Sequence, residues 1–259
     1  MKHFLFLLPL FVVPLLAQTE EDKEKAALAS EIRVIIAGIR PAPVFEKQGG
    51  EYVEVEPPLK SIYPTEISLL AGEIVKPKGA ENKKNDLSIW PNQILNVKPY
   101  KGPAAMKLGL LRRYRADRIE QSVEFDIGEM ITPLAIIHAD PGTAGWEKPQ
   151  VKLVELSPEK APTGSVIMVN LSGVPLAARF ESVADTIKPG AVKFLKLPAR
   201  ETDVFRFRID VPLANGKTYP LANSSYRIRK NQRLILLAIH DPQAPKGSPP
   251  LKLQMILDS

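Results

Sequence analysis

The sequence predicts an all-β protein built from two tandem β-sandwich domains, and three observations support this. Segments such as "VEFDI" (123–127) and "VFRFRIDV" (204–211) alternate apolar and polar residues, which is typical of strands with one buried and one solvated face. The 259 residues include 25 prolines, which favour turns over long helices. Two similar segments, "AIIHADPG" and "LAIHDPQ", carry His138 and His240, 102 residues apart, and this period indicates a duplicated unit.

The first element has the pattern of an export leader. Lys2 and His3 form a short basic head, the run 4–16 is apolar, and Ala17 is a small residue before polar chain. This is the layout of a secretory signal peptide, and the run is too short to span a bilayer. We therefore expect a signal peptide over 1–17 and an exported mature chain.

The next segment, 18–30, is polar and contains "TEEDKEKAALAS" (19–30). Thr19 is a potential N-cap, and three acidic residues follow it in the first turn, so a short helix is one interpretation. A helix of about a dozen residues is marginal by itself. A flexible polar leader is the other interpretation, and the sequence leaves both open.

Similarities at both ends of the repeat unit support the duplication. "YVEVEPPLKSIYPTEISLLAG" (52–72) parallels "VKLVELSPEKAPTGSVIMVNLSG" (151–173), and the two histidine segments match near the end of each unit. We therefore expect a first domain over 31–148 and a second over 149–259. The boundary is blurred, because 151–156 resembles both the end of the second unit and the start of the first.

Each unit of about 100 residues holds enough short strands for an immunoglobulin-like β-sandwich. Gly49-Gly50 and Asn215-Gly216 are pairs that tolerate positive φ, and we expect each to close a type I′ hairpin. The chain has no cysteine, so its cores are held by packing without disulfide bonds. Secreted animal proteins of this size usually carry disulfides, so their absence favours a bacterial envelope.

The two histidines are the most suggestive candidates for chemistry. An imidazole beside a carboxylate, as in His138 with Asp140 or His240 with Asp241, can bind a metal or relay a proton. A metal site needs three or four converging ligands, however, and the duplication places one histidine in each domain. The sequence favours the other interpretation, in which each strand ends in a turn capped by its own aspartate.

No catalytic motif stands out elsewhere. The chain lacks a Gly-x-Ser-x-Gly elbow, a His-Glu-x-x-His zinc motif and a glycine-rich phosphate loop. We therefore assign no catalytic, metal or cofactor-binding residue, and we expect a protein that is not an enzyme. A convergence of polar groups around His138 or His240 would argue for an enzyme instead.

Two arginine-rich segments, "LLRRYRADR" (110–118) and "YRIRKNQR" (226–233), stand out in a chain with a net charge of +6. Arginine interleaved with tyrosine can bind phosphates or sulfated sugars. In an exported protein the natural targets are acidic glycans or anionic lipids, and we expect no nucleic acid. The alternative, which the sequence favours, is a solvated strand face whose arginine stems cover apolar neighbours.

The leader "FLFLLPLFVVPLLAQTEEDKEKAALASEIRVIIAG" and the repeated "AIIHADPG" and "LAIHDPQ" carry a resemblance to a known group. The chain resembles the secreted immunoglobulin-like proteins encoded with type IV pilus components in mucin-associated Verrucomicrobia. The resemblance implies a periplasmic or outer-membrane protein of a Gram-negative bacterium, with a role in pilus assembly or host contact and adhesion. It carries no motif from which functional residues can be transferred.

The function expected from these observations is that of an exported, non-enzymatic binding or assembly protein. Its partners would be other envelope or pilus proteins, because a free sheet edge can add a strand from a partner. A homo-oligomer also stays open. The alternative is a cell-surface module that recognises carbohydrate such as mucin glycans. Only Trp90 and Trp146 would serve as tryptophan platforms for sugar, which weakens that alternative.

Overall fold

The computed structural model describes residues 28–70, 73–74, 86–114, 117–143, 145–196 and 204–258. Apart from one short 3-10 turn, η2 (Leu59–Ser61), the regular structure of these residues is β-strand, which confirms the predicted all-β class. In the first half the strands are β1 (Leu28–Ala37), β2 (Val44–Gln48), β3 (Glu51–Val55), β4 (Glu66–Leu69), β5 (Glu73–Ile74), β6 (Asp86–Ser88), β7 (Leu95–Gly102), β8 (Ala105–Tyr114), β9 (Asp117–Asp126), β10 (Pro133–Asp140) and β11 (Gly145–Glu155). In the second half they are β12 (Val166–Asn170), β13 (Leu176–Phe180), β14 (Val183–Ile187), β15 (Val192–Leu195), β16 (Val204–Pro212), β17 (Thr218–Arg227), β18 (Arg233–His240) and β19 (Leu251–Asp258).

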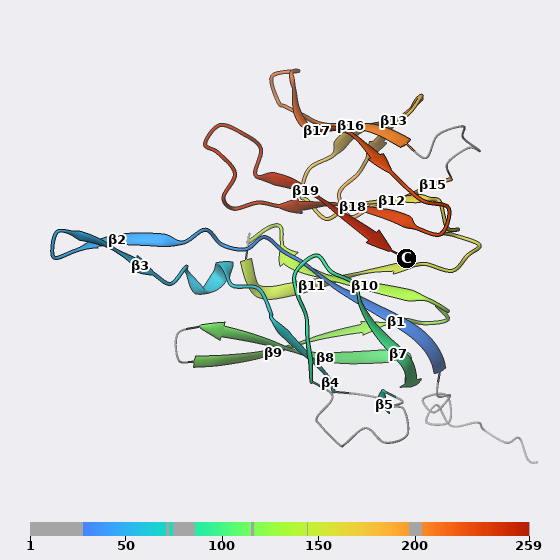
Figure 1. The fold of residues 1–259 in the computed structure, drawn as a ribbon, viewed down its shortest axis with the longest axis horizontal. Coiled ribbons are helices and arrows are strands. Elements are labelled where there is room, and N and C mark those ends of the chain that lie inside the picture. The colour runs from blue at the N-terminus through green and yellow to red at the C-terminus, as the bar shows by residue number, and fades with distance from the viewer. Residues whose placement is uncertain are drawn as a thin grey trace, which may run out of the picture.

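The strands form two tandem β-sandwiches, as predicted (Figure 1). The first consists of an inner sheet, β11-β10-β1-β7-β5, and an outer sheet, β6-β4-β8-β9. The second consists of an inner sheet, β15-β12-β18-β19, and an outer sheet, β14-β13-β16-β17. Each sandwich has the two-layer architecture of immunoglobulin-like domains.

The strand order repeats from one sandwich to the other. β1 pairs in parallel with β10 and antiparallel with β7, and β12 pairs in the same way with β18 and β15. β4, β6, β8 and β9 likewise correspond to β13, β14, β16 and β17 in the outer sheets. The counterpart of β12 is therefore β1, whereas the similarity of 52–72 to 151–173 had set β4 against β12. That similarity is local, and the pairing partners identify the equivalent strands.

The expected domain limits also shift. β11 spans Gly145–Glu155 and pairs with β10 along its length, so the limit expected between 148 and 149 falls inside a strand of the first sandwich. The chain passes to the second sandwich between 156 and 165. The Glu155 carboxylate holds this exit by accepting hydrogen bonds from the backbone N–H groups of Ile131, Thr132 and Ser157, at 2.8–3.0 Å.

For the start of the chain, the structure tests only the prediction for the last residues of the segment 18–30. Residues 1–27, with the expected signal peptide and most of the segment 18–30, lie outside the described residues. Leu28–Ser30, the end of the candidate helix, form the first residues of β1 instead. Among the described residues no helix has the length and apolar character needed to cross a membrane.

One of the two predicted hairpin turns is of the expected kind. Gly49 and Gly50 join β2 to β3 with φ values of 62° and 98°, as a two-residue turn with positive φ at both positions requires. In the β16–β17 connection only Gly216 has positive φ, and the backbone N–H of Leu213 donates to the carbonyl of Lys217. That turn is a longer loop, so the type I′ prediction for Asn215-Gly216 is wrong.

The two sandwiches pack face to face through their inner sheets, which gives four layers (Figure 1). We call this interface the seam. Its buried side chains come from both sandwiches: Ile35, Ala37, Leu134, Ile136, Val154, Leu156, Ala161, Ile167, Val169, Leu171, Ile235, Leu237, Ile239 and Ile256. β10 and β18 are therefore buried on both faces, which explains why they consist of continuous apolar runs without alternation.

Candidate functional site

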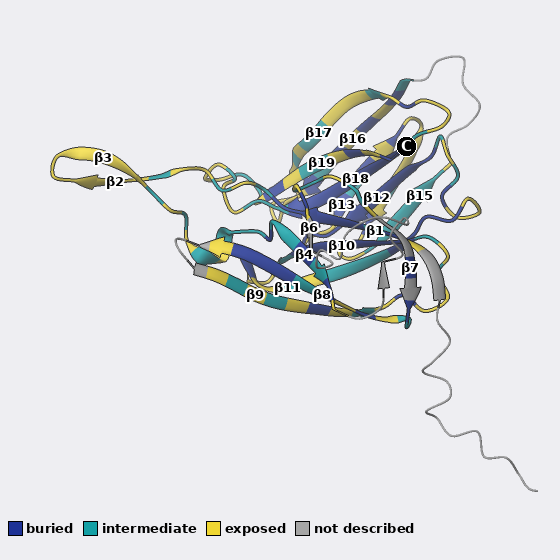
Figure 2. Cartoon of the chain, turned by 60° about the horizontal axis from the view of Figure 1, so that its bottom comes forward, coloured by how far each residue is buried: buried dark blue, intermediate teal, exposed yellow. Residues whose placement is uncertain are grey.

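The most distinctive feature of the molecule is a hairpin of β2 and β3 (44–55) that projects away from both sandwiches (Figures 1 and 2). We call it the arm. Its two strands pair with each other and, in the described residues, with no third strand. The arm is an insertion in the first unit, because 38–65 separate β1 from β4 whereas only 171–175 separate the equivalent β12 and β13.

One face of the arm carries two exposed aromatic side chains. The pairing places Phe45 opposite Glu54 and Tyr52 opposite Lys47, so Phe45 and Tyr52 lie diagonally on the same face. Phe45 is 55% exposed and Tyr52 is 75% exposed. The two rings are therefore exposed to solvent on one face of a two-stranded hairpin, a structure that is only marginally stable by itself in water.

The arm is also acidic on a basic protein. Glu46, Glu51 and Glu54 outnumber Lys47 within 44–55, which gives the arm a net charge of −2, whereas the whole chain has +6. The arm therefore carries charge of the opposite sign to the net charge of the chain.

The outgoing base of the arm is held by Asn92 in the loop before β7. Its side-chain Nδ2 donates to the Gly38 carbonyl at 2.7 Å, and its Oδ1 accepts from the Gly38 N–H at 3.3 Å. The backbone N–H of Asn92 donates to the Ile36 carbonyl at 2.8 Å, with Asn92 in the left-handed region at φ 59°. Asparagine tolerates that conformation better than most residues.

The returning base is held by Arg112 of β8, which is only 2% exposed. Its Nη1 donates to the Leu59 carbonyl in η2 at 3.2 Å. Burial lowers the pKa of the Arg112 guanidinium, and the charge of Glu147 opposes that shift.

From the second sandwich, Gln243 Nε2 donates to the Arg40 carbonyl at 3.2 Å. Both sandwiches therefore hold the segments that flank the arm, while the hairpin strands β2 and β3 extend into solvent.

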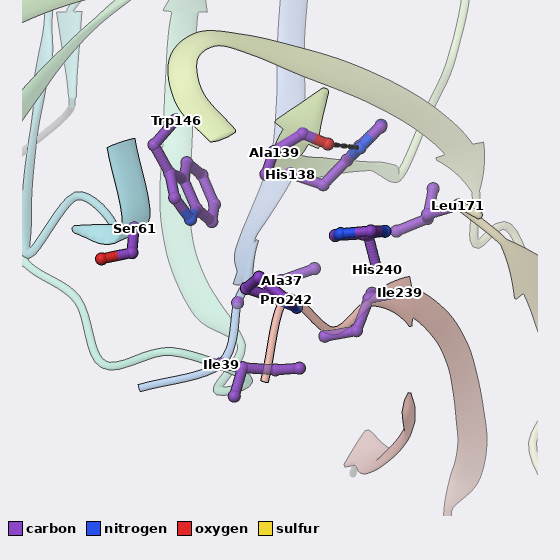
Figure 3. A pocket seen from close by; sticks show the side chains of 11 residues that line it. Ala37, Ile39, Ser61, His138, Ala139, Trp146, Leu171, Ile239, His240 and Pro242 are labelled. Atoms are coloured by element: carbon purple, nitrogen blue, oxygen red, sulfur yellow. Dashed lines mark hydrogen bonds between the residues drawn. The ribbon is translucent and has the colours of Figure 1, made fainter. Parts of the chain in front are cut away.

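A small cavity of about 30 Å³ lies beside this base, at the edge of the seam (Figure 3). A buried water needs roughly 10–15 Å³ of such space, so the cavity has room for one or two waters and not for an organic substrate. The side chains or backbone atoms that line it belong to both sandwiches and to η2: Ala37, Gly38, Ile39, Ser61, His138, Ala139, Trp146, Leu171, Ile239, His240 and Pro242.

The two histidines belong to different sandwiches, as the duplication predicted, and the cavity nevertheless brings His138 and His240 together. His138 is 7% exposed, and its Nδ1 lies 2.9 Å from the Ala139 carbonyl oxygen. Because a carbonyl only accepts, Nδ1 carries the proton in the neutral ring. Burial lowers the pKa of His138, against the raising effects of the Ala139 hydrogen bond and Asp140, and Lys152 lowers it further.

His240 is less deeply buried. Burial lowers its pKa as well, and the charge of Asp241 opposes the shift. The two rings thus favour their neutral forms. In the described part of the chain, no three histidine, aspartate or glutamate side chains converge as a metal site would require.

The two histidines are not equivalent positions of the repeat. Ile136 faces the seam from β10, so His138, two residues later on the same strand, lies on the seam side. On β18 it is Ile239, one residue before His240, that belongs to the buried seam cluster. The similar segments are therefore offset by one residue relative to the seam, although the ring of His240, at the end of its strand, lines the same cavity as His138 (Figure 3).

The predicted turn role of the aspartates that follow the histidines is confirmed. Asp140 Oδ1 accepts from the Gly142 N–H at 2.9 Å, and Asp241 Oδ1 accepts from the Gln243 N–H at 2.9 Å. In each sandwich the strand therefore ends in a turn that the aspartate caps. The second of these turns also supplies Gln243, which holds the arm base.

The arginine-rich segments do not form a single patch. Arg112 is buried at the arm base, Arg113 pairs with Glu66 at 2.6 Å, and Arg233 is buried against Asp258. The interpretation as a solvated strand face therefore fits Arg113, whose side chain is exposed, and is wrong for Arg112 and Arg233, which are buried.

The two tryptophans lie in different surroundings. Trp146 is 4% exposed in the first core, and Trp90 is 70% exposed. They do not form a paired platform, because only one of them reaches the surface.

The sequence predicted the hairpin at Gly49-Gly50 and missed its projection from the body. The signal that could have shown it is the extra length between equivalent strands, which a correct pairing of the units reveals. Comparison of the chain with protein-family models and with curated proteins gave no match.

Proposed function

We propose that this protein is an exported, non-enzymatic binding and assembly protein of the bacterial cell envelope, and that it contacts partner proteins through the arm. The single observation that carries the proposal is the arm itself. It is an inserted hairpin whose flanking segments are held by both sandwiches and whose strands, β2 and β3, are exposed to solvent. Two aromatic rings lie on one face of this hairpin.

Energetic considerations support an interaction role. Burying an aromatic side chain such as Phe45 or Tyr52 against a partner contributes on the order of 1.5–3 kcal/mol. Aromatic residues in central, well-packed positions supply much of the affinity of protein interfaces. The outer edges of the arm, which pair with no other described strand, also offer main-chain hydrogen bonds to an added strand.

The cavity with the two histidines gives less support to an enzyme. At about 30 Å³ it is far smaller than the roughly 300–1,000 Å³ typical of ligand sites. The resemblance to secreted proteins of type IV pilus loci makes pilus and outer-membrane components the first partners to test. With Trp146 in the core, Trp90 is the one tryptophan left for a carbohydrate platform.

The test is capture of partners from envelope fractions of the native host by cross-linking. The full chain is compared with a variant in which a short Gly-Ser turn replaces 44–55, and with a Phe45→Ser, Tyr52→Ser variant. Ile131→Ser with Leu70→Ser is the matched control, because these exposed apolar residues lie in the first sandwich, outside the arm. We expect both arm variants to lose the partners that the full chain and the control capture. Equal capture by the variant without the arm would overturn the proposal.

A further inference from the structure

We propose that the arm of one copy docks on the arginine-lined outer sheet of the second sandwich of another copy. This inference rests on the proposed function, since it names a partner for the arm. The docking site is an open trough over β13, β14 and β16, with a volume of about 430 Å³. Its floor includes Ala177 and Ala184, and Arg179 and Arg208 lie along it.

The trough is lined by two arginines and two aspartates, and each aspartate is paired with a cation other than Arg179. Arg208 Nε donates to both carboxylate oxygens of Asp210, at 3.0 and 2.8 Å, and Lys193 pairs with Asp185 at 2.5 Å. Arg179 lies directly opposite Arg208 in the pairing of β13 with β16. These pairs leave the positive charge of Arg179 available to an acidic ligand.

Two more arginines extend the basic character of this sheet beyond the trough. Arg206 lies two residues before Arg208 on β16, and Arg227 lies opposite Val204 on β17; both arginines are exposed. Glu181 is the nearby acid, and its Oε1 accepts a hydrogen bond from the Arg206 backbone N–H at 3.0 Å. In and around the trough, the basic residues outnumber the acidic ones: Arg179, Arg206, Arg208, Arg227 and Lys193 against Asp185, Asp210 and Glu181.

The chemistry of the arm complements that of the trough. Guanidinium groups pair with carboxylates and also stack on aromatic rings. The face of the arm that carries Phe45 and Tyr52 also carries Glu54 and Lys47. The net charge of −2 belongs to the arm as a whole, because Glu46 and Glu51 lie on its other face. The small side chains of Ala177 and Ala184 leave room for a ring beside Arg179. An acidic glycan would satisfy the arginines alone, whereas the arm matches both the charges and the apolar floor.

The contact would be between molecules. In Figure 1 the arm extends to the left from the seam, and the outer sheet of the second sandwich forms the top layer. An arm that docks on a different surface of the next copy leaves one free arm and one free trough at the ends. Such heterologous contacts generate open chains or closed rings.

The experiment measures self-association of the full chain by sedimentation velocity at low and high salt. The arm variant carries Tyr52→Ser and Glu54→Lys, and the trough variant carries Arg179→Glu and Arg206→Glu. We expect self-association of the unmodified chain that weakens with salt, and at least a tenfold weakening in either variant. A mixture of the two variants should form discrete one-to-one pairs, because each supplies the surface that the other lacks.

Arg118→Glu with Glu120→Lys on β9 is the matched control, since it reverses one exposed charge of each sign elsewhere. It should associate like the unmodified chain, and thermal unfolding should show that all variants are folded. A monomeric unmodified chain at low salt, or a trough variant that associates normally, would overturn the inference. The inference would also be overturned if the trough variant associated normally and lost only its retention on a sulfated glycan. If the arm is still required to capture envelope partners in these cases, the proposed function survives alone.

Discussion

Arg33 of β1 and Asp258 of β19 form an ion pair across the seam, although 225 residues separate them in the chain. Asp258 also accepts a hydrogen bond from Arg233 Nη1 at 2.9 Å, and Arg233 Nε donates to the Ala161 carbonyl at 2.6 Å. The Asp258 carboxylate thus forms an ion pair with one arginine from each sandwich. The end of the seam opposite the histidines is held by a buried ionic group.

Replacing Asp258 with alanine should strongly destabilise the protein, because Arg33 and Arg233 would both lose their buried counter-charge. We expect a loss of about 3–5 kcal/mol in the free energy of unfolding, measured by urea denaturation. Arg33→Met should cost less, since Arg233 still neutralises Asp258. Equal losses in the two variants would contradict this account of the triad.

The sandwiches should unfold in a single transition, because their inner sheets share the apolar seam. Ile235→Ala removes buried methyl groups there and should cost about 2–5 kcal/mol, with all probes still reporting one midpoint. Urea curves followed by far-ultraviolet circular dichroism and by tryptophan fluorescence provide the measurement. Two separated transitions in the unmodified protein would show that the seam does not couple the sandwiches.

Stability should fall as the pH drops below the ordinary histidine pKa of 6.5, because burial lowers the pKa of His138 in the folded state. The unfolded chain then binds a proton that the folded chain excludes, so this contribution is present above pH 6.5 and is lost towards the folded-state pKa. Carboxylates also titrate, so the readout is a comparison with His138→Gln. The variant should lose less stability than the unmodified protein between about pH 7.5 and 5.5, the range in which an ordinary histidine titrates, and parallel losses would refute a role for His138.

Arg112→Met should loosen the base of the arm without removing its aromatic face. The Leu59 carbonyl would lose its buried donor, which costs about 1–3 kcal/mol. Hydrogen–deuterium exchange should accelerate in 56–63 while exchange in β18 changes little after correction for global stability. Lys107→Met, at an exposed ion pair on the same strand, is the control and should leave exchange at the arm base unchanged.

Much of the fold could be predicted from local patterns. Alternation in β16 and the Asp-Pro turns after β10 and β18 depend on neighbouring residues, whose periodicity and turn chemistry act over a few positions. The alignment of 52–72 with 151–173 failed because short strand sequences resemble one another. The hydrogen-bond partners of each strand show that β1, and not β4, is the counterpart of β12. These partners lie far along the chain, so no local sequence pattern reveals them.

By itself, the sequence determined the strands, the duplicated sandwich and the capped turns, because each follows from side-chain periodicity or from the backbone preferences of a few residues. Only the tertiary structure decided that the inner sheets pack together, that His138 and His240 meet at one cavity, and that the arm stands clear of the body. The continuous apolar runs in β10 and β18 indicate that both faces of each strand are buried. They do not indicate which part of the chain covers the second face. That layer comes from the other sandwich, so its identity depends on packing between residues far apart in the chain, such as Ile136 and Leu237, which belong to one buried cluster.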